Sequence, residues 1–212
     1  MLSMNSKKIA IILIPLNIIL AFLIYNSINS EIDSEIDFQA AAKNRIAENI
    51  QKLKDLRQVQ IAYKKVKNNY ANNFDDLIYF LENDSMPIIK AIGERPDTLT
   101  DAEALKIGII SRDTTYQLAK ETVFNSAYLK TRNKDFPLEI STLTNIPHSN
   151  TKYKINSGTI EKGKVLVQVF EISTTYKNVF TGMKAENKNY DLNSLLKVGS
   201  MEEASLNGNW GE

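Results

Sequence analysis

The feature that most constrains this chain is an uncharged run of twenty residues near its N-terminus, Ile9 to Ile28. As a helix rising about 1.5 Å per residue, the run would be roughly 30 Å long, the thickness of a bilayer's hydrocarbon core. Basic residues precede it and acidic residues follow it: Lys7 and Lys8, then Glu31, Asp33, Glu35 and Asp37. Because short basic flanks resist translocation, we expect residues 1–30 to form a cytoplasmic tip and a transmembrane anchor.

Two other interpretations of the run remain open. A cleaved signal peptide also has a basic start and an apolar core, but that core is usually ~7–15 residues and ends at an A-x-A site. Here the run is longer, and only Ser27 and Ser30 offer weak cleavage positions. A buried core helix is disfavoured by the asymmetric charge. Within the run, Asn17 is either a tolerated polar residue, which we favour, or a hydrogen-bonding contact to a partner helix.

Composition excludes several classes of site. The 26 basic and 25 acidic residues nearly balance, so no broad positive surface for nucleic acid is expected. There is no cysteine, which excludes disulfides and thiolate sites, and the single histidine, His148, excludes motifs that need two. We therefore predict no metal, no cofactor and no nucleic-acid partner.

Residues 31–72 are expected to continue the anchor as a long amphipathic helix, a stalk. Glycine and proline are absent from Leu16 to Met86. Apolar residues recur at spacings of three and four, which places them on one helical face: Leu56, Val59, Tyr63, Val66 and Tyr70. This stripe is either a coiled-coil seam or the face on which the chain's own domain packs. We favour the second, because the pattern spans fewer than ~3–4 heptads and its tyrosines are large for a seam.

Residues 73–212 are expected to form a small α+β domain with an antiparallel sheet. Asn73 can cap a helix over residues 74–82, and Thr100 with Glu103 forms a capping box for a helix over 101–106. Strands are expected at 88–92, 109–116, 138–143, 153–155 and 165–172, with the last two paired through a turn near Gly163. Residues 124–133 are ambiguous, and 191–197 are expected to be a short helix.

No catalytic constellation is evident along the chain. His148 lies in the turn-like segment NIPHSN and is interpreted as a solvated loop residue. Neighbouring carboxylates such as Asp75 and Asp76 do not face each other on a helix. Near the C-terminus, Trp210 is expected to dock the tail onto the domain, with a partner contact as the alternative. A non-enzymatic protein is therefore expected.

The segment Leu53 to Leu81, LKDLRQVQIAYKKVKNNYANNFDDLIYFL, resembles the passage from helix to loop in type IV pilins and type II secretion pseudopilins. The resemblance implies a helix packed on an antiparallel sheet and a subunit of an envelope assembly. The region SKKIAIILIPL lacks the glycine and acidic residue of the prepilin peptidase motif. The ending LKVGSMEEASLNGNW is similar to membrane-anchored proteins of Bacteroidota, which implies a periplasmic domain.

Three tripeptides are similar to the Asp-Ser/Thr sites at which Bacteroidota attach O-glycans. They begin at Asp84, Asp97 and Asp113, and would carry glycans on Ser85, Thr98 and Thr114. Asp beside Ser or Thr also favours turns and caps for structural reasons, which is the interpretation we favour.

These observations together predict an α+β protein with an N-terminal transmembrane helix that continues into a long amphipathic helix packed on a small antiparallel-sheet domain. The expected role is a structural or scaffolding subunit of a cell-envelope assembly. Expected partners are the membrane and other envelope proteins, including further copies bound through the anchor or stalk. The alternative is a periplasmic glycan- or peptide-processing enzyme, or a soluble binding protein released from a signal peptide.

Overall fold

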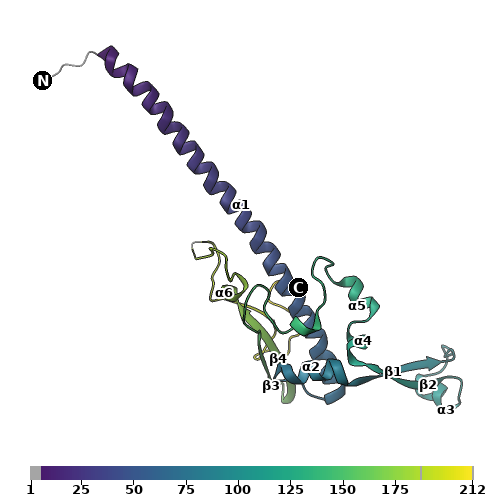
Figure 1. Ribbon diagram of the computed structural model, residues 1–212. Helices are drawn as coiled ribbons and strands as arrows, with labels where there is room; N and C mark the ends of the chain where they lie inside the picture. Colours follow the sequence, from purple (N-terminus) through teal and green to yellow (C-terminus); the bar gives the residue numbers. More distant parts are fainter. Residues whose placement is uncertain (1–5, 187, 212) are drawn as a thin grey trace. The chain divides into compact units, whose positions relative to one another are not determined.

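The computed structural model describes residues 6–186 and 188–211, with side chains described from Pro15 onward except at Ala91 (Figure 1). Internal contacts divide the chain into two units, residues 1–46 and 47–212. This division falls within the helix that the sequence predicts over residues 31–72. The protein combines a long N-terminal helix with two small antiparallel sheets, as expected for the α+β class.

Helix α1 (Ser6–Lys67) is 62 residues long and passes through both units. In the first unit, its large apolar side chains are between 50% and 64% exposed from Leu16 to Ile36. In the part of the chain whose side chains are described, no helix is both long enough and apolar enough to cross a membrane. The predicted span Ile9–Ile28 lies partly outside that part, since the side chains of residues 9–14 are not described.

In the second unit, α1 is buried on its apolar and polar sides alike. Large apolar side chains of this segment are buried, among them Leu56 and Val59 of the apolar stripe and Leu53 one turn before it. Asp55 and Gln60, two polar residues of the same segment, are 1% and 0% exposed. Polar residues of α1 are buried here because the loops of residues 68–73 and 131–145 supply hydrogen-bond partners to them.

Helix α2 (Phe74–Asn83) begins where the sequence predicts it. The Asn73 side chain accepts a hydrogen bond of 2.8 Å from the backbone N–H of Asp76. The Gln60 amide bridges the turn between α1 and α2, donating to the Ala71 carbonyl at 2.8 Å and accepting from its N–H at 3.0 Å. This local hydrogen bonding fixes the reversal of the chain, which lets α2 bury Phe80 and Leu81.

The strands form two separate antiparallel sheets. Strand β1 (Ser85–Ile92) pairs with β2 (Ser111–Leu118), and the second sheet has the order β3 (Lys154–Lys162), β4 (Val165–Thr175), β5 (Leu195–Gly199). Short helices lie between the strands: α3 (Asp101–Lys106), α4 (Ala119–Val123), α5 (Ser126–Thr131), the 3₁₀ helix η1 (Ile140–Thr142) and α6 (Tyr176–Val179).

Most of the predicted strands exist, but two elements differ. The hairpin of β3 and β4 with its turn at Gly163 is confirmed. The strand expected over 138–143 is wrong, since residues 140–142 form a 3₁₀ turn. The helix expected over 191–197 is also wrong, because Leu196 and Val198 alternate into the core as β5 pairs with β4.

We predict that Leu56→Ala lowers the free energy of unfolding by about 2–5 kcal/mol, because it removes a fully buried side chain from the centre of the second unit. Urea unfolding of the full chain in detergent measures the change. Leu166→Ala is the matched control, since Leu166 is 74% exposed on β4. Equal losses for both variants would contradict the burial of α1.

Candidate interaction surfaces

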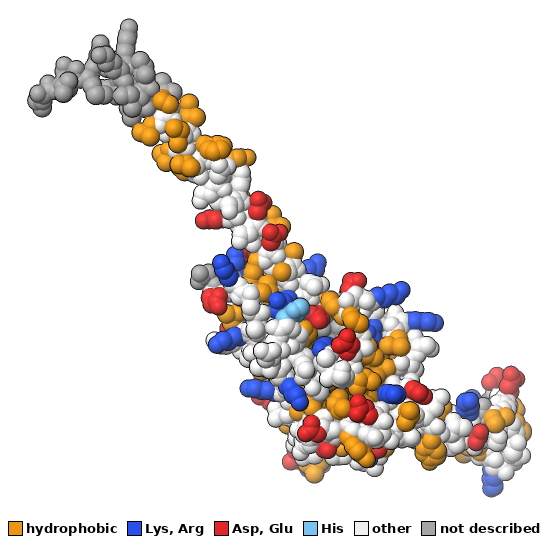
Figure 2. All heavy atoms as spheres, in the orientation of Figure 1, with side chains coloured by type: hydrophobic (Ala, Val, Ile, Leu, Met, Phe, Trp, Pro, Cys, Tyr) orange, Lys and Arg blue, Asp and Glu red, His pale blue; other side chains and the backbone are white. Residues whose placement is uncertain are grey.

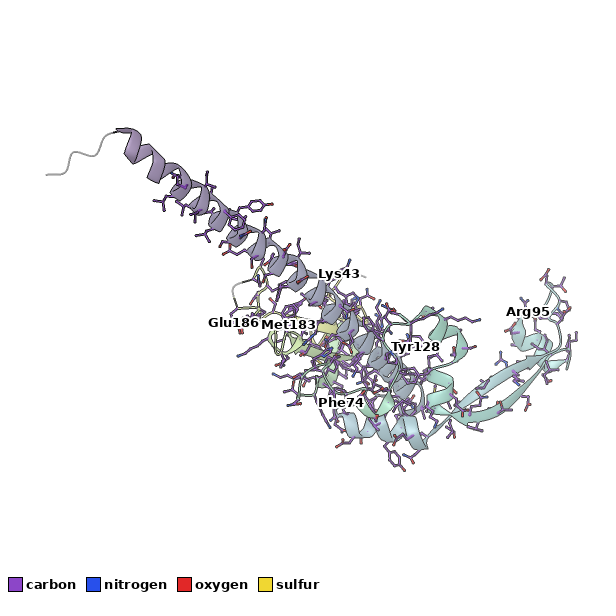
Figure 3. The ribbon with its side chains drawn as sticks, turned by 45° about the horizontal axis from the view of Figure 1, so that its top comes forward. Lys43, Phe74, Arg95, Tyr128, Met183 and Glu186 are labelled. Atoms are coloured by element: carbon purple, nitrogen blue, oxygen red, sulfur yellow. The ribbon has the colours of Figure 1, made fainter. Side chains whose placement is uncertain are left out.

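The most exposed part of the second unit is a hairpin that we call the β-arm, residues 85–118. It consists of β1, β2 and the short helix α3 at its far end (Figure 1). Every residue of β2 is exposed. Figure 3 shows Arg95 at the tip of the β-arm, far from Phe74 and Tyr128 in the body of the unit. The β-arm therefore contacts the body only at its base.

Both faces of the β-arm carry apolar as well as polar side chains. In the β1–β2 register, Pro87 lies opposite Tyr116 and Ile89 opposite Thr114, so these side chains share one face. Ile89 is 61% exposed and Tyr116 is 71% exposed. The other face carries the cross-strand pair Lys90 and Asp113 together with Ile88 and Ile92, and Ile92 is 56% exposed. Figure 2 shows hydrophobic side chains along the β-arm beside charged ones.

The tip of the β-arm is held by local polar contacts. The Thr100 hydroxyl accepts from the backbone N–H of Glu103, whose carboxylate accepts from the backbone N–H of Thr100 at 2.8 Å, and this confirms the predicted capping box. The hydrogen bonds that the carboxylate accepts from the backbone N–H and the hydroxyl of Thr100 hold the pKa of Glu103 below its usual value. Arg95 pairs with Asp101 at 3.0 Å. The end of the β-arm is thus an ordered turn despite its exposure.

The base of the β-arm is fixed by Asp84 and its neighbours. Lys67 Nζ lies 2.8 Å from Asp84 Oδ2, and this hydrogen bond raises the pKa of Lys67. The backbone N–H of Ala119 donates to the Asp84 carbonyl at 2.8 Å. Met86, the second residue of β1, is buried. These contacts tie both ends of the hairpin to α1 and α4.

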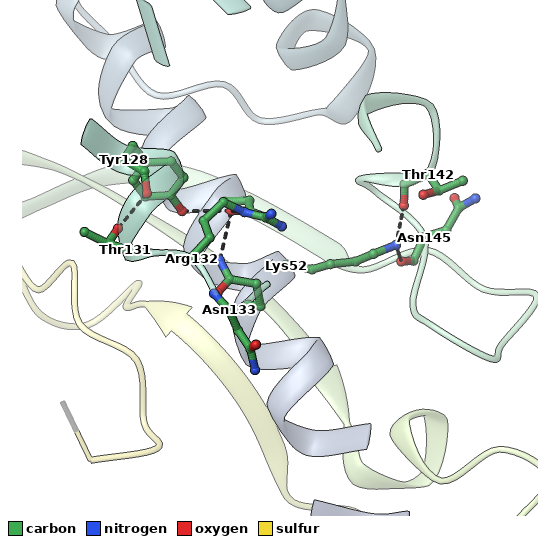
Figure 4. Close-up of polar contacts among 9 residues, drawn as sticks. Lys52, Tyr128, Thr131, Arg132, Asn133, Thr142 and Asn145 are labelled. Atoms are coloured by element: carbon green, nitrogen blue, oxygen red, sulfur yellow. Dashed lines mark hydrogen bonds and ion pairs between the residues drawn. The ribbon is translucent and has the colours of Figure 1, made fainter. Parts of the chain in front are cut away.

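A buried polar network centres on Asp55 of α1 (Figure 4). Arg132 binds the carboxylate with two hydrogen bonds, Nε to Oδ1 at 2.9 Å and Nη2 to Oδ2 at 2.8 Å. The Tyr128 hydroxyl and the Gln51 amide donate to Oδ1 at 2.8 and 3.1 Å. Gln51 in turn accepts from the backbone N–H of Asn133 at 3.0 Å. The network therefore joins α1 to α5 and the loop after it.

The chemistry of this network is that of a structural clamp. Burial, and the adjacent Asp55 carboxylate after it, raise the pKa of Tyr128, which keeps the phenol protonated and donating. A few residues away, Lys52 Nζ donates to the carbonyls of Thr142 and Asn145 at 2.7 and 3.1 Å, and burial lowers its pKa. With Asp55 only 1% exposed, a substrate has no access to its carboxylate.

The five residues of the apolar stripe on the stalk lie inside the second unit. Leu56, Val59 and Tyr70 are buried, and Tyr63 and Val66 are half-buried. Tyr63 packs edge-on against Phe80 of α2, with ring centroids 5.4 Å apart. These side chains therefore pack against their own chain in this structure.

The other two proposed contact residues lie in different surroundings. Asn17 is exposed on α1 within the first unit. Trp210 is half-buried, with Lys54 Nζ 6.0 Å from its ring centroid, and a Cβ added to Gly208 would lie 2.2 Å from the ring. Asn209 donates its backbone N–H to the Lys197 carbonyl at 3.1 Å. The tail thus lies along β5.

The three residues proposed for glycans all lie in the β-arm. Ser85 begins β1, Thr98 lies in the tip and Thr114 lies in β2, and all three are exposed. Their accessibility meets a requirement for modification, and glycosylation stays a prediction. Their clustering in one hairpin was not visible from their spacing along the sequence.

The remaining candidates offer little chemistry. His148 is exposed, with Nε2 3.1 Å from the Glu48 carboxylate. A hollow of about 510 Å³ lies beside α6 and has one carboxylate, Glu186, in its lining. Within residues 6–186 and 188–211, no group of three or more acidic or histidine side chains is placed to hold a metal ion.

No protein-family model, curated protein or solved structure matches this chain. We therefore infer a function from the surfaces of the chain itself.

We predict that Asp55→Ala lowers the free energy of unfolding by roughly 3–5 kcal/mol, because it leaves the Arg132 guanidinium buried without its partner. Combining it with Arg132→Met should recover part of that loss, which a double-mutant cycle of urea unfolding measures. Asp101→Ala breaks an exposed ion pair as a control and should cost at most about 1 kcal/mol. An Asp55 effect no larger than the control would contradict the clamp.

We also predict that Gly93→Ala disorders the tip of the β-arm. Gly93 has a φ of 101°, and an added Cβ would lie 2.3 Å from the Ile109 carbonyl oxygen. Gly108→Ala is the matched control, since φ is 77° there but no atom lies within 4 Å of the added Cβ. Hydrogen exchange of the amides of residues 94–110 should rise much more for Gly93→Ala. Equal exchange in the two variants would refute the close contact.

Proposed function

We propose that this chain is a single-pass inner-membrane protein whose periplasmic domain is a structural subunit of a cell-envelope assembly. The N-terminal part of α1 would be the transmembrane anchor, with Lys7 and Lys8 on the cytoplasmic side. Residues 47–212 would be the folded periplasmic domain, and the β-arm its contact surface.

The observation that carries the proposal is the change in surroundings along α1. From Leu16 to Ile28, large apolar side chains are exposed around the helix, whereas from Leu53 to Val59 the same helix buries its apolar side chains in a folded domain. An apolar helix surface of this kind is stable in lipid and costly in water. Together with the uncharged run that begins at Ile9, it supports an anchor in the membrane.

A structural role in an assembly has separate support. The polar cluster around Asp55 is closed to solvent and acts within the fold, while the β-arm exposes apolar side chains at the surface. A contiguous patch of exposed apolar groups marks a contact site more often than apolar residues scattered singly over the surface do. The pilin-like passage from α1 to α2 is consistent with such an assembly and supports a pilus- or secretion-like one.

The alternative proposal is a glycan- or peptide-processing enzyme, or a soluble binding protein released from its signal peptide. The hollow beside α6 has a volume within the range of small-molecule sites. Glycoside hydrolysis, however, needs two carboxylates across one site. Among the residues that line this hollow, Glu186 is the single carboxylate. The anchored structural subunit is therefore the better supported function.

We predict that the double variant Ile19→Lys/Leu23→Lys releases the protein from the membrane. Each lysine at mid-span costs about 2.5–3.5 kcal/mol of insertion free energy. Fractionation with an alkaline wash measures the shift from the membrane pellet to the supernatant. Tyr79→Lys/Leu166→Lys is the matched control, because these side chains are also more than half exposed but lie in the second unit.

Intact mass of the protein from native membranes completes this test. A full-length mass with retention of the wild type and the control in the pellet is the expected result. A mass short by the first ~28 residues, with a soluble wild type, would overturn the anchor and favour the signal peptide.

A further inference from the structure

We propose that two copies of this chain pair through their β-arms, edge to edge along β2, about a two-fold axis at Thr114. The result is a four-stranded antiparallel sheet with the order β1, β2, β2 and β1. This inference deepens the proposed function, on which it rests, by naming a second copy as a partner and β2 as the contact.

The β-arm has the properties of an incomplete sheet. An isolated two-stranded hairpin is marginally stable in water, and three or more strands are generally needed. β1 and β2 pair over eight residues, and no further strand pairs with either of them within the described part of the chain. Their outer edges therefore present unpaired backbone groups over most of the length of the β-arm.

The free edges of β1 and β2 are not equivalent, because a proline in β1 weakens that edge for pairing with another strand. Pro87 is the third of the eight residues of β1 and has no backbone N–H to donate. β2 contains no proline and no glycine, and all eight of its residues are exposed. Edge pairing by β2 is therefore favoured over pairing by β1.

The charges of the β-arm fit a second copy. Residues 85–118 contain four basic residues (Lys90, Arg95, Lys106 and Arg112) and five acidic ones (Glu94, Asp97, Asp101, Glu103 and Asp113), a net charge of −1. The signs are interspersed, so the β-arm offers no field of one sign to select an oppositely charged partner. A second copy carries the same interspersed charges, so the two surfaces can be complementary to each other.

The sequence of β2 also selects the position of the two-fold axis. An axis at Arg112 or at Asp113 would place like charges directly opposite each other, which is destabilising. An axis at Thr114 places Arg112 opposite Tyr116 of the second copy, a cation–π pair that occurs twice. It also pairs Thr114 with itself and leaves seven of the eight residues of β2 paired.

The faces of the two β-arms match in this arrangement. Directly opposed residues of an antiparallel pair lie on the same face, so an axis through one residue keeps the corresponding faces of both β-arms on the same side. Ile89 and Tyr116 of the two copies then lie on one face of the sheet, with Thr114 and Arg112 of both copies between them.

Cysteine crosslinking tests the pairing directly, because the natural chain has no cysteine. Thr114→Cys places the two thiols across the axis, where opposed Cα atoms lie about 4.5–5.5 Å apart, within the reach of a disulfide. Ile89→Cys is the matched control, since Ile89 is the cross-strand neighbour of Thr114 on the same face. Its counterpart would lie three strand spacings away, about 14 Å, which is too far to bridge.

Oxidation of full-length protein in native membranes should convert most of Thr114→Cys to a species of twice the chain's mass. We expect at least about tenfold less of that species for Ile89→Cys, given the limits of disulfide geometry. Equal crosslinking of both variants, or none of Thr114→Cys, would overturn the pairing. A glycan on Thr114 in the wild-type mass would also overturn it, because two glycans would meet at the axis.

A charge pair in the Thr114→Cys background provides a second measurement. The proposed register places Asp113 opposite Thr115 of the second copy, so Thr115→Asp should lower the crosslinked fraction severalfold and Thr115→Lys should preserve it. If the two substitutions act alike, this register is refuted.

The test separates the pairing from the anchor. A monomeric Thr114→Cys that stays in the membrane pellet overturns the pairing alone. A crosslinked dimer recovered in the soluble fraction overturns the anchor alone.

Discussion

Burial of the Asp55 carboxylate is the constraint on which much of the folded unit depends. A charged group that is 1% exposed is stable only when its desolvation is offset by close partners. Arg132, Tyr128 and Gln51 supply them, and Arg132 is 77 residues away along the chain. The segment from α4 to the loop at Asn133 must therefore return to α1. That return leaves β1 and β2, which precede α4, as a separate hairpin.

A single helix thus meets two very different environments. Its second part is enclosed by polar and apolar groups of one domain, where Asn49, Gln51, Asp55 and Gln60 all find partners. Its first part exposes leucines and isoleucines from Leu16 to Ile36. Helix propensity and hydrophobic periodicity predict a helix for both parts, since both lack proline and glycine after Pro15. What differs is the exposure of the apolar side chains of each part.

Local interactions were the ones that the sequence predicted correctly. The cap at Asn73 and the capping box of Thr100 and Glu103 each join residues three positions apart, so their spacing was sufficient. β5 was mistaken for a helix, because its partner β4 lies outside any local window. The clamp on Asp55 was missed for the same reason, although Gln51 four residues earlier is a helical neighbour that could have drawn notice. The exposure of the β-arm is set by how little of the described chain packs against it. A local sequence pattern carries no information on such packing.

The proposed anchor would raise the local concentration of the chain, on which the proposed pairing of β-arms depends. Edge pairing of two short strands buries far less than the roughly 1,200 Å² of a stable interface, so free copies in dilute solution would separate. Copies held in one membrane have a high effective concentration, and weak contacts between them become occupied. On the proposed arrangement, the β2 edges would pair where the chain is anchored and stay unpaired elsewhere. The weakness of a single β2 edge would then confine the proposed assembly to the membrane surface.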